Sequence, residues 1–156
     1  MSAPVLFLGW GNPSRGDDAL GPLFINHMEA LIARHPEWGT VECLTDFQLQ
    51  VENALDLQGR ERVLFVDASV SSPAPFGLER ISAAKDASFS THAMSPQAVL
   101  QVYTEIEDGE PPPCWLLSIR GEAFELGAPP SAAAQAHLKQ ALIAAAAWIE
   151  QRPAGR

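Results

Sequence analysis

Short apolar runs alternate with amphipathic helical patterns along this chain, and that alternation constrains the fold more than any other feature. The first unit begins with the apolar run Pro4–Gly9 and the turn Gly11–Gly16. A short apolar run bounded by turn residues is typical of a buried strand. Apolar residues then recur at spacings of four, four and three, namely Leu20, Phe24, Met28 and Leu31. This spacing indicates one buried helix face, and the helix should end near Arg34.

The same alternation continues to the end of the chain. We expect further strands at Val41–Leu44, Arg62–Ala68, Phe76–Ala83 and Cys114–Ile119, and further helices at Val51–Leu57, from Ser95–Pro96 to the acidic patch Glu105–Glu110, and from Ser131 to about Glu150. Phe76–Ala83 roughly alternates and is expected to be an antiparallel edge strand. The order predicts one α/β layered domain over residues 1–150, with helices on both faces of the sheet. The tail Gln151–Arg156 is expected to fray.

Composition and charge narrow the class of protein. A length of 156 residues fits one domain, and 47% apolar with 19% charged residues is a globular composition. The net charge of -9 disfavours binding to nucleic acid and to anionic membrane surfaces. The sequence has no apparent signal peptide and no apolar run of about 18 residues that would span a bilayer. We therefore expect a cytoplasmic protein.

The glycine turn resembles a nucleotide-binding loop only in part. Gly9-Trp10-Gly11 begins like a dinucleotide fingerprint, but the third glycine is missing, and no P-loop lysine follows. Asp17 and Asp18 stand at the start of the helix, where a pyrophosphate would lie, and their charges would repel it. We therefore expect no nucleotide cofactor. For Asp17 we favour a structural role, in which its charge complements the helix dipole.

Three chemistry-bearing residues are expected near one edge of the sheet. Ligands of open α/β sheets bind beyond the carboxyl ends of the strands. Asp18 follows the first strand, Asp67 ends a second, and His92 lies in the segment before a helix. Two carboxylates and an imidazole suit a divalent transition metal with open positions. The alternative is that these are ordinary solvated polar residues, and the residue types alone leave both interpretations open.

Other polar and aromatic residues receive structural interpretations. Asp46 is expected to cap a turn and Asn12 to brace the glycine turn through backbone bonds. Trp10 either contacts a substrate or covers the core, and Gln48 and Glu52 either contact a substrate or cap a helix. Three histidines are interpreted as packing or surface residues: His27 as packing, and His35 and His137 as surface. The cysteines, Cys43 and Cys114, lie in expected strands, which argues against a cysteine nucleophile.

Four motifs in order give the chain a specific resemblance. They are GWGNPSRGDDALG (Gly9–Gly21), FVDA (Phe65–Ala68), THAMSP (Thr91–Pro96) and LLSIRGEAFELG (Leu116–Gly127). Together they resemble the hydrogenase maturation endopeptidases, which process the large subunit of [NiFe] hydrogenases. FQLQVENA (Phe47–Ala54) is similar to a motif of one branch of that family. The resemblance extends from about Val5 to Ile149.

The resemblance implies a fold, an activity and a partner. The fold would be a three-layer sandwich, with a twisted, mostly parallel five-stranded sheet between helices. The activity would be a single cut that removes a C-terminal extension from the large-subunit precursor after nickel insertion. The partner would be that nickel-loaded precursor, which would itself supply the nickel. Apart from the resemblance, a monomer is the simplest expectation for an enzyme that must admit a large protein.

The resemblance also implies site residues. The family binds metal through two carboxylates and a histidine, which match Asp18, Asp67 and His92. Many relatives have Glu where this chain has Asp18, so the carboxylate here stands about one bond length, ~1.5 Å, further back. Some relatives carry the histidine just after the Ser-Pro, at the position of Gln97. The family is classed with aspartic-type peptidases, which implies Asp18 and Asp67 as catalytic residues.

Two mechanisms and two rival functions remain open. Nickel either acts as a Lewis acid or water activator, or it positions the substrate while one carboxylate serves as general base. We prefer metal-assisted positioning, because a bound cation lowers the pKa of both carboxylates rather than leaving them a shared proton. The first rival function is a non-catalytic, nickel-dependent binding module or maturation chaperone on the same fold. The second is another α/β hydrolase that uses the same edge of the sheet on substrates unrelated to hydrogenase.

Overall fold

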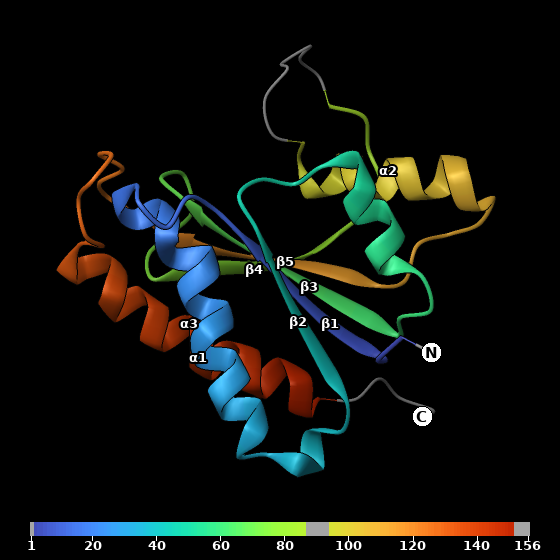
Figure 1. Cartoon of the computed structure of the whole chain (residues 1–156), viewed down its shortest axis with the longest axis horizontal. Helices are drawn as coiled ribbons and strands as arrows, with labels where there is room; N and C mark the ends of the chain where they lie inside the picture. Colours follow the sequence, from blue (N-terminus) through green and yellow to red (C-terminus); the bar gives the residue numbers. More distant parts are fainter. Residues whose placement is uncertain (1, 87–93, 152–156) are drawn as a thin grey trace.

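The computed structural model describes residues 2–86 and 94–151. In this part of the chain, five strands form one sheet in the order β2-β1-β3-β5-β4 (Figure 1). Their bounds are Val5–Trp10 (β1), Val41–Asp46 (β2), Arg62–Ser69 (β3), Phe76–Ile81 (β4) and Cys114–Arg120 (β5). All neighbours are parallel except β4, which pairs antiparallel with β5. The predicted mostly parallel sheet and its antiparallel edge strand are therefore confirmed.

Helices cover both faces of this sheet, as the element order predicts. The α-helices are Leu20–Ala33 (α1), Pro96–Glu107 (α2) and Ala132–Glu150 (α3), and the 3-10 helices are Gly16–Ala19 (η1), Pro36–Trp38 (η2) and Val51–Leu57 (η3). Figure 1 shows α1 and α3 side by side on one face, and α2 with η3 on the other. The result is the three-layer α/β arrangement.

The strands divide their side chains between two hydrophobic clusters. In β1, Val5 and Phe7 pack toward α1 and α3, whereas Leu6 and Leu8 pack toward η3 and α2. This alternation follows from the two-residue period of a strand, and each fully buried side chain contributes roughly 1.5–3 kcal/mol. In β3, Val63 and Phe65 belong to the cluster under η3 and α2. Asp67 lies two residues after Phe65 in β3 and is therefore on the same face of the sheet.

Helix α3 is held at both ends by polar contacts. At its start, the Ser131 hydroxyl accepts a hydrogen bond from the Ala134 N–H at 3.2 Å. At its end, the buried Arg62 guanidinium donates to the carbonyl oxygens of Trp148 (2.7 Å), Ile149 (2.7 Å) and Gln151 (3.0 Å). A cation at these carbonyls complements the negative end of the helix dipole.

One predicted helix has a different form. Val51–Leu57 is a 3-10 helix rather than an α-helix. Its start is fixed by Asn53, whose side chain accepts from the Gln50 N–H at 2.7 Å. Such side-chain bonds to the backbone compete with regular helix bonds, and 3-10 helices are typically short.

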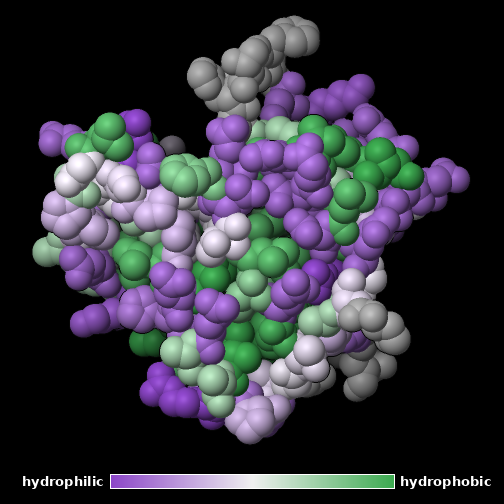
Figure 2. Space-filling view, viewed as in Figure 1, coloured by the Kyte–Doolittle hydropathy of each residue, from purple (hydrophilic) through white to green (hydrophobic). Residues whose placement is uncertain are grey.

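The surface is largely polar, with apolar atoms in limited areas. Figure 2 shows green surface over β2 and beside η3 and α2 on the viewed face. Among the exposed apolar side chains, Phe47, Val51 and Leu55 follow β2 and lie on or just before η3. No helix within residues 2–86 and 94–151 is long and apolar enough to cross a membrane.

Candidate functional site

The carboxyl ends of the neighbouring strands β1 and β3 lie where the strand order reverses: the chain adds β2 on one side of β1 and β3 on the other. β1 pairs with β2 on one side and with β3 on the other, so the chain leaves β1 at a topological switch point. Open parallel sheets bind ligands at this point, because the loops after the two strands diverge and leave space. Asp18 follows β1 and Asp67 lies near the end of β3.

The turn after β1 presents Asp18 through close backbone contact. The Asp18 carboxylate oxygen Oδ2 accepts a hydrogen bond from the Asn12 N–H at 2.6 Å. Gly11 has φ +147°, and a Cβ placed on it would lie 2.0 Å from the Asp18 carbonyl oxygen. Only glycine fits there. Asn12 in turn accepts from the Ser14 N–H at 2.8 Å, so its predicted bracing role is confirmed.

Asp67 is a carboxyl group whose charged form is disfavoured. Burial, with a smaller contribution from the negative charge of nearby Asp18, raises its pKa to about 7, although a hydrogen bond from the Ala68 backbone N–H opposes the rise. The two carboxylates are therefore electrostatically coupled at the edge of the sheet. Like charges that share a buried site attract a cation or retain a proton. This chemistry fits the divalent metal that the sequence predicts.

Asp17 lies one residue before Asp18 but has a different environment. It is fully buried, and its carboxylate accepts from Glu122 N–H (2.7 Å), Ala123 N–H (3.0 Å), Ser131 N–H (2.6 Å) and the Ser131 hydroxyl (2.8 Å). Burial raises its pKa, but these donors outweigh burial and hold the pKa below its usual value. The predicted structural role is correct in kind, but the contacts are with a distant segment. The sequence gives no signal for them, since about a hundred residues separate the partners.

The third predicted ligand, His92, lies outside the described residues. Its alternative, Gln97, is in the first turn of α2, and its carbonyl oxygen accepts from the Ala84 N–H at 3.1 Å. No three His, Cys, Asp or Glu side chains within residues 2–86 and 94–151 are grouped so as to hold a metal ion. Asp18 and Asp67 are thus the part of the predicted set whose surroundings are described.

The remaining predicted residues have structural environments. Trp10 is buried and packs edge-on against Phe65, with ring centroids 6.1 Å apart, so it covers the core. Asp46 accepts from the Phe47 N–H at 2.9 Å, as predicted for a turn cap. Both cysteine thiols have a pKa raised to about 12 by burial, which agrees with inert side chains.

Two histidine interpretations are wrong. His137 is half-buried rather than on the surface, and its ring nitrogen Nδ1 lies 2.9 Å from the Arg120 carbonyl oxygen. His27 is exposed rather than packed in the core. It lies one turn after Leu23 at the flank of the apolar stripe of α1, where the side chain stands toward solvent.

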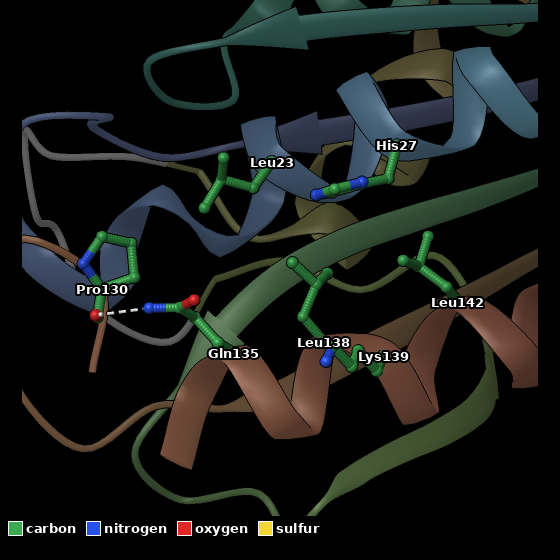
Figure 3. A pocket seen from close by; sticks show the side chains of 7 residues that line it. All are labelled: Leu23, His27, Pro130, Gln135, Leu138, Lys139 and Leu142. Atoms are coloured by element: carbon green, nitrogen blue, oxygen red, sulfur yellow. Dashed lines mark hydrogen bonds between the residues drawn. The ribbon is translucent and has the colours of Figure 1, made fainter. Parts of the chain in front are cut away.

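A separate groove lies between α1 and α3. Leu23, Leu138 and Leu142 form its apolar wall, and His27 and Lys139 stand at its rim, in a volume of about 530 Å³ (Figure 3). Gln135 bridges to the Pro130 carbonyl oxygen at 3.1 Å at one end. Among the residues that the structure describes, those lining this groove include no carboxylate. Its chemistry differs from that of the sheet edge, where the acids lie.

Comparison with solved structures identifies the fold. The chain is similar to the [NiFe] hydrogenase maturation protease HycI from Thermococcus kodakarensis KOD1 (20% identity, 96% of this chain and 94% of that chain, TM-score 0.68). It is also similar to the hydrogenase maturating endopeptidase HybD from E. coli (22% identity, 96% and 93%, TM-score 0.71). A third similar structure is HybD from Thermococcus kodakarensis (17% identity, 96% and 99%, TM-score 0.64).

The sequence comparisons find no match, in contrast to the structural comparisons. Neither a known family model nor a curated protein sequence matches the chain. At about 20% identity, the structural likeness shows a common fold over nearly the full length, and not a common activity. The chain has the fold of [NiFe] hydrogenase maturation proteases.

Proposed function

We propose that this protein is an endopeptidase that removes a C-terminal extension from a nickel-loaded [NiFe] hydrogenase large-subunit precursor. The observation that carries the proposal is the pair Asp18 and Asp67, which lie at the switch point of a sheet shared with maturation proteases. Asp18, Asp67 and His92 would bind the nickel that the precursor carries. Asp18 and Asp67 would also serve the cleavage step.

The electrostatics of the pair support cation binding. A divalent cation between two carboxylates removes their repulsion, and the raised pKa of Asp67 measures how strongly its anion lacks compensation. Asp18 stays fixed by the Asn12 N–H, so one ligand is positioned before the substrate arrives. Both features favour a substrate that brings positive charge to this edge.

Cleavage needs an activated water and a proton for the leaving amine. Substrate-borne nickel would supply Lewis acidity or substrate positioning at this edge. A carboxyl with a pKa of about 7 can accept a proton from water and later release it to the amine at neutral pH. Asp67 therefore suits proton transfer when no cation lowers its pKa, whereas nickel ligation favours the ionised form.

The partner would dock around the carboxylate edge through apolar contacts. Phe47, Val70 and Leu126 follow β2, β3 and β5, and their side chains are 64%, 59% and 68% exposed. Exposed apolar side chains around a polar site are typical of protein interfaces. A large folded precursor can reach them, because all three lie beyond the same ends of the strands.

The deciding experiment compares nickel-loaded with nickel-free precursor. The purified protein is mixed with each form, and the mass of the precursor is followed by mass spectrometry. We expect loss of a C-terminal peptide from the nickel-loaded form alone. A stable complex without any mass loss would instead support the non-catalytic binding module. Cleavage of unrelated proteins at similar rates would overturn the assigned substrate.

A further inference from the structure

The turn that carries Asp18 is attached to the segment 121–131, and Asp17 is the centre of that attachment. We propose that Asp17 is a positioning residue: its buried carboxylate fixes the turn to this segment and thereby holds the Asp18 carboxylate in place beside Asp67. The inference rests on the proposed function for its consequence in catalysis. Its structural part stands on the contacts that follow.

The backbones of the two segments are in direct contact. Gly16 N–H donates to the Ala128 carbonyl oxygen (3.0 Å), and Asp17 N–H donates to that of Ala123 (2.8 Å). Gly16 has φ +50°, and a Cβ there would lie 2.5 Å from the Ala123 carbonyl oxygen. The turn therefore has little freedom to move away from this segment without losing several hydrogen bonds at once.

The Asp17 side chain adds contacts that only a carboxylate can make. Its oxygen Oδ1 accepts from Ser131 N–H, while Oδ2 accepts from Glu122 N–H, Ala123 N–H and the Ser131 hydroxyl. Both oxygens are thus acceptors, and an amide at this position would turn an N–H toward a donor. Gly121 allows the approach, since a Cβ on it would lie 3.1 Å from the Asp17 Cβ.

The constraint passes to Asp18 through the shared backbone. Asp18 N–H donates to the Arg15 carbonyl oxygen at 2.9 Å, so Asp18 belongs to the same turn. Its carboxylate then accepts from Asn12 at 2.6 Å. A short charge-assisted hydrogen bond depends steeply on geometry, so a loosened turn weakens it.

A buried charge is a costly way to stabilise a fold, because desolvation offsets much of the gain. The α3 cap itself is the Ser131 hydroxyl, which accepts from the Ala134 N–H, so the Asp17 carboxylate is not the group that caps the helix. Asp17 instead joins the turn, the end of β5 and the start of α3 in one network. Buried networks of this kind fix geometry, and geometry is what a metal or catalytic ligand requires.

The test is Asp17→Asn, assayed without and with substrate. Without substrate, amide hydrogen exchange of Asn12 should become about tenfold faster than in the wild type under conditions where both proteins are folded, because the Asn12 N–H loses its held acceptor. With nickel-loaded precursor, kcat should fall about tenfold or more while KM stays within about twofold. Unchanged Asn12 protection, or lost protection with unchanged kcat, would overturn the proposal.

Two further variants keep the test decisive. Ser131→Ala removes one donor to Asp17 and should shift Asn12 exchange in the same direction by a smaller factor, even if Asp17→Asn does not fold. Leu138→Ala destabilises α3 from the buried side; it should speed exchange of Leu64 in the core strand β3 and leave that of Asn12 within about twofold of the wild type. Tenfold faster Asn12 exchange in this control would mean that general loosening suffices, which contradicts positioning. Exchange is measured on the protein alone, so it decides the structural claim even if the wild type does not process the precursor.

Discussion

Asp17 and Asp67 are both carboxyl groups at the same end of the sheet, yet their pKa values shift in opposite directions. The Asp17 pKa falls below its ordinary value of 3.8, although burial opposes this, because four donors contact its two oxygens. The Asp67 pKa rises to about 7, because burial is compensated only in part and Asp18 adds like charge. Burial alone thus does not decide the charge of an acid; the donors around it do.

The contrast separates a structural acid from a candidate functional one. An acid that the fold fully satisfies has no capacity left for a ligand. An acid that the fold leaves under-compensated gains most from a proton or a cation that arrives from outside. By this criterion, Asp67 and its neighbour Asp18 form the candidate reactive pair, whereas Asp17 has a structural role.

The sharpest test of the contrast removes the reactive acids. Asp18→Ala and Asp67→Ala should each lower processing of nickel-loaded precursor by on the order of 10³-fold, the loss typical of a group acting at the reacting centre. Circular dichroism should show the fold intact. Asp46→Ala is the matched control, since Asp46 ends the neighbouring strand β2 but caps a turn, and it should process within about twofold of wild type. Normal processing by Asp18→Ala or Asp67→Ala would remove the site assignment.

The next test concerns the third ligand. His92→Ala should lower processing by about 10²-fold, because loss of one of three ligands weakens metal capture without removing the acids. Gln97→Ala should have a much smaller effect, measured in the same precursor assay. The opposite ranking would place the third ligand in the first turn of α2 instead.

Stability should distinguish the two kinds of acid. Asp17→Asn should lower the free energy of unfolding at pH 7 by about 2–4 kcal/mol, because buried donors lose a charged acceptor. The folded-state pKa of Asp17 is depressed, so its contribution is present above the ordinary pKa and is lost as pH falls below it. Urea unfolding should therefore show a smaller difference from wild type at pH 3 than at pH 7. A constant difference would contradict the assigned cause.

Asp67→Asn should have the opposite effect on stability and on its dependence on pH. The folded-state pKa of Asp67 is raised, so wild-type stability from this group is present below pH 4 and is lost as pH rises through about 7. The variant should therefore be more stable than wild type by about 1–2 kcal/mol at pH 8 and equal to it, within error, at pH 4. Thermal unfolding at both pH values measures this. A variant less stable than wild type at pH 8 would refute the under-compensation of Asp67.

The smallest effect is expected at the rim of the site. Phe47→Ser should leave the free energy of unfolding within about 0.5 kcal/mol, since its side chain is exposed. It should raise KM for the precursor about three- to tenfold with kcat unchanged, because it removes docking contact only. Ile143→Ser is the control, because Ile143 is similarly exposed but lies in the C-terminal half of α3, and it should leave KM unchanged.

Sequence patterns predicted most of the fold, because strands and helix caps are local. Ser95 and Ser131 mark helix starts that the structure confirms, and Arg62–Ala68 differs from β3 by one residue. The sequence pattern did not predict that Val51–Leu57 is a 3-10 helix or that His137 is half-buried. Each depends on a side-chain contact that periodicity does not encode, with Asn53 in one case and the Arg120 backbone in the other.

For the site, sequence predicted which acids follow strands but not how the fold treats them. Asp17 and Asp18 are identical residues in adjacent positions. Their difference arises from Glu122, Ala123 and Ser131, which reach Asp17 only after β5 and α3 are in place. Long-range contacts of this kind leave no local pattern.

The attachment of α3 at both ends restricts how this helix can change in length. Ser131 at its start contacts Asp17, near the carboxyl ends of the strands. Its last carbonyls contact Arg62, which begins β3 at the opposite end of the strands. One inserted residue would rotate one end by about 100° and shift it by about 1.5 Å relative to the other. Both attachments could not then be kept. The helix therefore acts as a spacer of fixed length, 19 residues. An insertion or deletion within it would disturb the Asp17 contacts beside Asp18 even when it lies several turns away from them.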